Sequence, residues 1–193
     1  CDNVVNTGKF EWQLSRAQVL EKAPVQEDQA LLSGGEEEGT DLPTLADTDG
    51  GRQERLLAAR RKDFTWPRFE AFVRGAFLAV QQAWTDGDLE RLRPLESRAL
   101  WSTHRYWLER YARAGLRNVL EGVKVERVQP VRYELDPFYE SVTVRIFAKM
   151  LDTTQAGDGR IVSGQPDVPR RFSEYWTFIP AIGTVPGEDV KEC

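Results

Sequence analysis

The chain contains 193 residues with a mass of 22.0 kDa, which suffices for one domain of ordinary size and some additional chain. Hydrophobic residues make up 40% of the sequence and aromatic residues 10%, so the chain can fill a core and is not wholly disordered. No apolar run approaches the ~20 residues that span a bilayer, and no basic region followed by an apolar stretch predicts a signal peptide. The net charge of −5 argues against nucleic acid as a partner through bulk electrostatics.

The only two cysteines, Cys1 and Cys193, lie at opposite ends of the sequence and therefore exclude a disulfide scaffold. Two thiols also cannot complete a four-ligand zinc site within this chain. The sequence has no nucleophile elbow, no glycine-rich phosphate loop and no metal-ligand spacing. We therefore expect neither a cofactor nor a metal site in this chain.

The N-terminal arm, residues 1–22, has a short amphipathic pattern. Phe10, Trp12 and Leu14 alternate with polar residues, which predicts a short strand or an extended arm. A lone strand is not stable by itself. The arm must therefore dock on this domain or on a neighbouring one.

The next segment, residues 23–62, begins with strongly acidic sequence. Residues 23–51 contain eight acidic residues, no basic residue and five glycines. Such a stretch cannot bury enough apolar surface to offset the entropy lost on ordering. We therefore predict an acidic, flexible linker, which ends in a helical lead-in from residue 53.

Residues 63–183 form the predicted folded domain, with 17 basic residues, 16 acidic residues and all but one of the tryptophans. Apolar residues recur at helical spacing between Thr65, a plausible N-cap, and Gly87, which predicts a long first helix. A short second helix follows it. A third helix is predicted at residues 95–114, and its apolar face holds Leu100, His104, Trp107, Leu108 and Tyr111.

After residue 122 the hydrophobic period changes to two. Strands are predicted at residues 123–133, 141–150, 160–164 and 171–179. Helices followed by strands with short turns indicate an α+β domain in which the N-terminal helices pack on a curved four-stranded antiparallel sheet. A long helix across such a sheet leaves a cone-shaped cavity at its mouth. Residues 184–193 are predicted to be a tail.

Several short motifs in this domain occur in an order typical of a known family. They are Phe72 with Gly75 and Ala76, Ala83-Trp84 before Gly87-Asp88-Leu89, Val142-Thr143-Val144-Arg145, and Phe172-Ser173-Glu174-Tyr175-Trp176-Thr177-Phe178. Over residues 66–183 the sequence resembles the C-terminal domain of the mitochondrial inner-membrane translocase subunit 44 and its bacterial relatives. The resemblance implies a cone-shaped fold of the cystatin-like, nuclear transport factor 2-like kind. It also implies a non-enzymatic tether associated with anionic lipid and translocating chains.

The N-terminal arm carries a second resemblance. Cys1, Gly8, Phe10 and Trp12 are spaced like the end of a zinc ribbon in some bacterial relatives, and Cys193 would then begin a following ribbon. This interpretation implies that the chain lies between two flanking zinc-ribbon domains and contains neither metal site. An alternative is that Cys1 is the lipidated first residue of a mature lipoprotein.

Two groups of side chains are candidates for binding. The first would line the apolar cavity and comprises Phe72, Ala76, His104, Trp107, Trp176 and Phe178. The second, which would contact phosphate headgroups or another anionic ligand, comprises Arg98, Arg105 and Arg113 on the third helix. If that helix face is merely solvated, Glu109 pairs with its arginines instead. The sequence thus predicts a non-catalytic binding or tethering module for membrane lipid or an extended peptide, either peripheral to a membrane or cytoplasmic.

Two other functions stay open at this point. A small-molecule enzyme of isomerase or dehydratase type would use His104 and Glu174 as acid and base, and requires the two side chains to face each other. The simpler interpretation of His104 is a histidine that packs in the core without a catalytic role. The other function that stays open is a purely structural spacer that binds no ligand.

Overall fold

The computed structural model describes residues 12–19, 37, 39–137 and 139–180. The predicted arm before residue 12, much of the linker, the tail and both cysteines lie outside these residues. The helices are α2 (Gly50–Arg60), α3 (Trp66–Asp86), α4 (Leu89–Leu92) and α5 (Arg98–Arg113). The strands are β1 (Trp12–Val19), β2 (Leu116–Leu135), β3 (Glu140–Ala156), β4 (Ile161–Gly164) and β5 (Arg170–Pro180).

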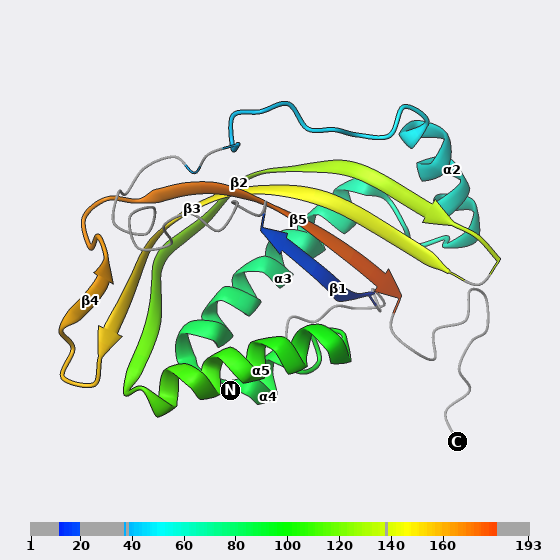
Figure 1. The fold of residues 1–193 in the computed structure, drawn as a ribbon. Helices are drawn as coiled ribbons and strands as arrows, with labels where there is room; N and C mark the ends of the chain where they lie inside the picture. The colour runs from blue at the N-terminus through cyan, green and yellow to red at the C-terminus, as the bar shows by residue number, and fades with distance from the viewer. Residues whose placement is uncertain (1–11, 20–36, 38, 138, 181–193) are drawn as a thin grey trace, which may run out of the picture.

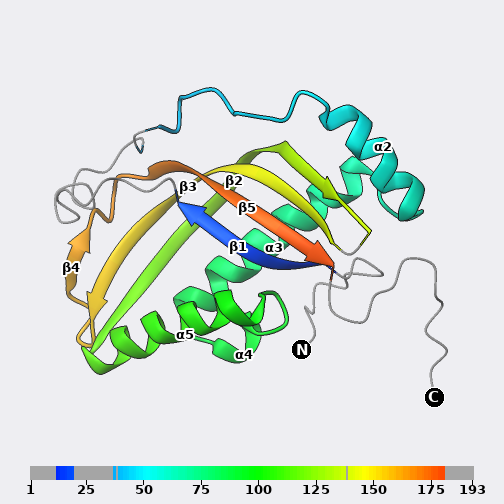
Figure 2. The same ribbon diagram turned by 45° about the vertical axis from the view of Figure 1, so that its right-hand side comes forward.

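The strands form a curved antiparallel sheet, and α3 and α5 lie against one side of it (Figures 1 and 2). The strand order is β1-β5-β3-β2, and the short β4 pairs with β3. The α+β class with helices packed on an open antiparallel sheet is therefore confirmed. Part of the predicted N-terminal arm forms β1, which docks on this domain. It pairs with β5 from Trp12 opposite Pro180 to Val19 opposite Glu174.

Helix α3 contacts the sheet more extensively than any other helix does. It begins after Thr65 with a proline in the first turn and ends at Gly87, whose φ of 67° is available to glycine without strain. Its buried residues follow helical spacing along one face. They are Phe69, Val73, Ala76, Phe77, Val80 and Ala83.

The core between α3 and the sheet is rich in aromatic rings. The ring of Phe77 lies 5.1 Å from that of Trp176, and Phe69 meets Phe178 edge-on at 5.6 Å. On β3, Val142, Val144 and Ile146 complete this face and are fully buried. Aromatic pairs of this geometry stabilise a core beyond the area that they bury. We call this side of the sheet the helix face.

Helix α5 packs more loosely than its sequence predicts, because none of its residues is fully buried. Ser97 caps the helix by accepting a hydrogen bond from the Leu100 N–H at 3.3 Å. The side that faces the protein holds Leu100, Trp101 and Leu108, which pack on the core. The expectation that Trp107 lies on the buried side of α5 is wrong. Trp107 is 43% exposed and lies at the edge of the row of residues that contact the core.

The end of the predicted acidic linker crosses the other side of the sheet (Figure 1). We call residues 39–49 the strap, and the side that it covers the strap face. The Asp47 N–H donates to the Val131 carbonyl at 2.8 Å, and the Arg145 guanidinium donates to the Leu42 carbonyl at 2.7 Å. This part of the segment is therefore docked on the domain, unlike the free linker that its composition predicts.

Candidate functional site

His104 on α5 is held by a carboxylate from the segment just before this helix and by an aromatic ring from α3. Its Nδ1 lies 2.7 Å from Glu96 Oε1, and its ring meets Trp84 edge-on at 5.3 Å. The Glu96 side chain is fully buried, and its Oε2 has no hydrogen-bond partner among the described residues. Glu96 therefore fixes the orientation of the imidazole through its Nδ1.

Glu174 lies on the same side of the sheet, on β5. Its Oε2 accepts a hydrogen bond from the Trp176 indole N–H at 2.7 Å. Burial raises the pKa of the Glu174 carboxyl, and the positive charges of Arg170 and His104 oppose this rise only in part. His104 and Glu174 therefore lie on the same side of the sheet, and each forms a hydrogen bond with another residue, His104 with Glu96 and Glu174 with Trp176.

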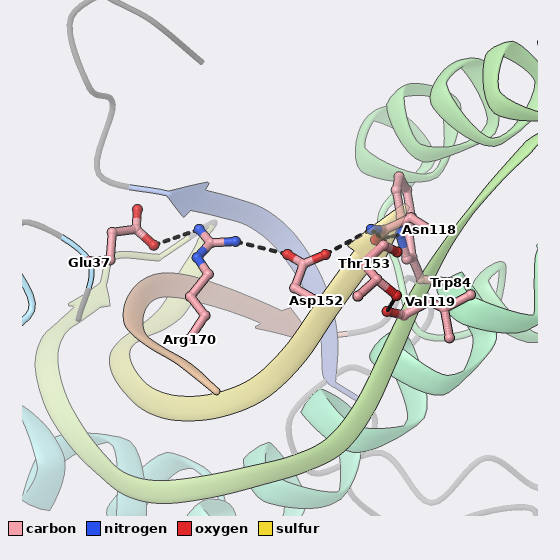
Figure 3. Close-up of polar contacts among 7 residues, drawn as sticks. All are labelled: Glu37, Trp84, Asn118, Val119, Asp152, Thr153 and Arg170. Atoms are coloured by element: carbon pink, nitrogen blue, oxygen red, sulfur yellow. Dashed lines mark hydrogen bonds and ion pairs between the residues drawn. The ribbon is translucent and has the colours of Figure 1, made fainter. Parts of the chain in front are cut away.

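A chain of polar contacts joins the elements around this region (Figure 3). The Trp84 indole N–H donates to Asn118 Oδ1 at 2.8 Å, and the Asn118 amide donates to Asp152 Oδ1 at 2.8 Å. Arg170 then donates to Asp152 at 3.0 Å and to Glu37 at 2.6 Å. Arg170 pairs with the carboxylates of both Glu37 and Asp152, so this series of contacts positions α3, β2, β3 and β5 relative to one another. Sequence patterns gave no signal for it because its members are far apart along the chain.

The residues predicted to line a cavity divide into two groups. Ala76, Trp176 and Phe178 are buried in the core cluster, and Phe72 packs on Phe178 with ring centroids 5.6 Å apart. These four come together between α3 and β5. The remaining two, His104 and Trp107, lie on α5, where Trp107 faces outward.

The three predicted arginines of α5 share an outward face with residues that the sequence interpretation did not single out. We call this face the α5 outer surface. It includes the exposed residues Arg98, Arg105, Tyr106, Trp107, Glu109, Arg110 and Arg113. The helical spacing of the aromatic and arginine residues, three and four apart, is the signal that could have identified Tyr106 and Arg110.

Arginine side chains on this surface lie over tryptophan rings. The guanidinium carbon of Arg110 is 5.3 Å from the centre of the Trp107 ring, and that of Arg105 is 5.0 Å from Trp101. Such contacts are favourable and orient both groups. The pair between Arg105 and Glu109, 3.8 Å apart, is half exposed and therefore weak. Most of the positive charge of the surface thus faces solvent.

These features define the class of protein first: an α+β domain of the nuclear transport factor 2-like kind, with helices on one face of an open antiparallel sheet. The family model of the Tim44-like domain matches residues 53–187, so the chain belongs to the Tim44-like domain family. A search of curated proteins found no significant match. The matched region begins after β1 and the strap.

Membership of this family suggests a non-catalytic role that is membrane-associated or protein-binding. In the part of the chain that the structure describes, no helix is both long and apolar enough to cross a bilayer. Peripheral association is the kind of membrane contact that fits this family.

Proposed function

We propose that the chain is a non-catalytic tethering module whose α5 outer surface binds an anionic membrane. The observation that supports this proposal is the combination of arginines and exposed aromatic rings along the exposed side of α5. Tyr106 is 51% exposed and Trp107 43% exposed, and their rings meet edge-on at 5.4 Å. Large exposed apolar side chains next to basic residues are typical of interfacial helices.

The charge balance of α5 favours an anionic partner. Arg98, Arg105, Arg110 and Arg113 are exposed, whereas Glu109 is the only acidic residue within α5. Glu96, just before the helix, is buried under His104 and does not face outward. Each basic residue near an anionic membrane contributes about 1 kcal/mol, and salt screens the attraction over about 10 Å at 0.1 M ionic strength.

The aromatic side chains supply a second, less salt-sensitive contribution. Tryptophan and tyrosine favour the headgroup region of a bilayer because their rings are apolar but carry a polar group. Arg110 lies over the Trp107 ring, so the same contact presents a ring and a phosphate donor together. The predicted cavity residues Phe72, Trp176 and Phe178 pack on other side chains, so the proposal relies on the helix surface rather than on the interior.

The test is co-sedimentation with vesicles of phosphatidylcholine alone or of phosphatidylcholine and phosphatidylglycerol, at low and high salt. We expect binding only to the anionic vesicles and weakening by salt. The triple variant Arg98→Glu, Arg105→Glu, Arg113→Glu should lose at least about a hundredfold in affinity, from about 1 kcal/mol for each charge. Trp107→Ser should weaken binding at both salt concentrations.

The control carries the same charge change elsewhere, as Arg52→Glu, Arg55→Glu, Arg160→Glu on exposed residues of α2 and the β3–β4 turn. It should bind nearly as the parent chain does. Equal loss in both triple variants would mean that net charge, not α5, decides binding. Failure of the parent chain to bind anionic vesicles at low salt would refute the proposal.

A further inference from the structure

Arg145, at the centre of the strap face, is the most buried basic residue of the described chain. It is 1% exposed although it lies on the side of the sheet that contacts the strap rather than the helices. Its guanidinium donates to the Leu42 carbonyl at 2.7 Å, to the Gly39 carbonyl at 2.8 Å and to the Ser173 hydroxyl at 3.0 Å. The strap therefore both covers this cation and supplies most of its acceptors.

The positive charge of Arg145 has no carboxylate partner within ion-pair distance among the described residues. Neutral carbonyls and hydroxyls receive its hydrogen bonds, and the rings of Phe147 and Tyr175 lie 4.6 and 5.4 Å from the guanidinium carbon. A buried cation is expected to be paired, and a hydrogen bond to a charged acceptor is about twice as strong as one to a neutral acceptor. With the strap docked, the Arg145 guanidinium therefore lacks this stronger hydrogen bond to a carboxylate.

The two ends of the covering segment are held by further arginines. Asp47 accepts from Arg132 at 3.1 Å, and Glu37, just before the strap, pairs with Arg170 at 2.6 Å. Arg127 also lies over Phe147, at 3.9 Å from the ring centre. The strap face thus recognises an extended peptide by main-chain carbonyls in the middle and by the Asp47 carboxylate at one end, whereas Arg170 holds Glu37 from the helix-face side, where it also bonds to Asp152.

Polar contacts rather than apolar burial hold the strap in place. Leu42 is 61% exposed and Leu45 is 83% exposed, so their side chains contribute little to docking. The strap also lies outside residues 53–187, which form the Tim44-like domain. Its release would uncover Arg145, Phe147 and Tyr175 without opening the apolar core on the helix face.

We propose that the strap face is a binding site for an extended acidic peptide of a partner protein, and that the strap occupies this site in cis. Because the strap is part of the same chain, it competes at an effective concentration in the millimolar range. A partner peptide therefore binds when it offers a carboxylate to Arg145 or when the strap is weakened. This site lies on the opposite side of the sheet from α5, so it is independent of membrane binding (Figure 2).

The test uses the full chain and a fluorescent synthetic peptide of residues 39–49 as the probe, with fluorescence anisotropy as the readout. In the variant Thr44→Ala, Asp47→Lys, the strap loses its contacts with Gln129 and Arg132. We expect this loosened chain to bind the probe at least tenfold more tightly than the parent chain. Adding Arg145→Gln to the loosened chain should abolish the gain.

A disulfide lock separates competition from misfolding. The Asp47 N–H donates to the Val131 carbonyl at 2.8 Å, so the two backbones lie close enough for cysteines at both positions, in a chain with Cys1→Ser and Cys193→Ser, to fix the strap. The oxidised chain should not bind the probe, and reduction should restore binding. Binding that is the same in the oxidised and reduced chains, or no binding to the loosened chain, would overturn the proposal. Tighter binding of a single-stranded oligonucleotide than of the probe would overturn its assignment to an acidic peptide.

Discussion

The two faces of the sheet are covered by different physical means. On the helix face, α3 packs apolar and aromatic residues such as Phe77 against Trp176 on β5. On the strap face, an extended segment with exposed leucines is held by hydrogen bonds and ion pairs to arginines. The first contact buries apolar surface and cannot open without unfolding the domain. When the strap detaches, water replaces its hydrogen bonds and ion pairs with the sheet. This second contact can therefore form and break while the domain stays folded.

Truncation of the central ring of the helix face should have the largest effect. Phe77 is fully buried between Trp176 and Phe172, so Phe77→Ala should lower the free energy of unfolding by about 3–5 kcal/mol. Urea denaturation measures this value. Leu78, the next residue, is 44% exposed and provides the control, because Leu78→Ala should change stability by less than about 0.5 kcal/mol. Similar losses in both variants would contradict the packing described for α3.

Removal of the central donor of the strap face should have a smaller and more local effect. Arg145→Met keeps an apolar stem but deletes the donors to Gly39, Leu42 and Ser173. Because the released carbonyls can be hydrated once the strap detaches, we expect a loss of about 1–3 kcal/mol. Hydrogen exchange should show lost protection of the Asp47 amide, which bonds to Val131, while α3 stays protected.

Arg127→Met is the matched control for this change, since Arg127 contacts the same Phe147 ring but is exposed. It should leave the Asp47 amide protected. If Arg145→Met instead lowered protection throughout α3, the strap would be an integral part of the core, and the distinction between the two faces would fail.

The sequence predicts the helix face well because one periodicity determines it. The cap at Thr65, the apolar stripe and Gly87 predict a helix that the structure places at Trp66–Asp86. Strand β2 is longer than predicted, since it begins at Leu116 rather than near residue 123. Gly122, which suggested a strand boundary, has a φ of 60° and lies where the β2–β3 register shifts, so it is a bulge within the strand.

The strap face could not be predicted in the same way. Arg145 alternates with apolar residues along β3, a pattern that places an arginine on a solvated face. The carbonyl that it contacts most closely, that of Leu42, is 103 residues away in the sequence and lies in a segment whose composition indicates disorder. Only the folded sheet brings the two together. The outward position of Trp107 is likewise set by how α5 sits on its neighbours rather than by its own sequence.

Replacement of Glu174 on the helix face should raise the stability of the domain, whereas the substitutions of Phe77 and Arg145 should lower it. Burial raises its carboxyl pKa, so the folded state holds the proton more tightly than the unfolded state does. Its contribution therefore lowers the free energy of unfolding as the pH rises from the ordinary carboxyl range through the raised pKa. Glu174→Gln keeps an oxygen acceptor for the Trp176 indole and should raise the melting temperature at pH 7 more than at pH 4. Equal shifts at both pH values would show that desolvation of this carboxyl does not matter.

The smallest effect is expected at the end of the strap. Asp47 and Arg132 form an ion pair of 3.1 Å, but their side chains are 36% and 53% exposed, so the pair contributes between about 0 and 1 kcal/mol. Asp47→Asn should therefore leave the urea midpoint almost unchanged. Strap opening should nevertheless become more frequent, which cysteine labelling of a Thr44→Cys chain, with Cys1 and Cys193 replaced by serine, can measure. Faster labelling without a change in global stability would separate strap release from unfolding. Coupled changes in both would mean that the strap opens only when the whole domain does.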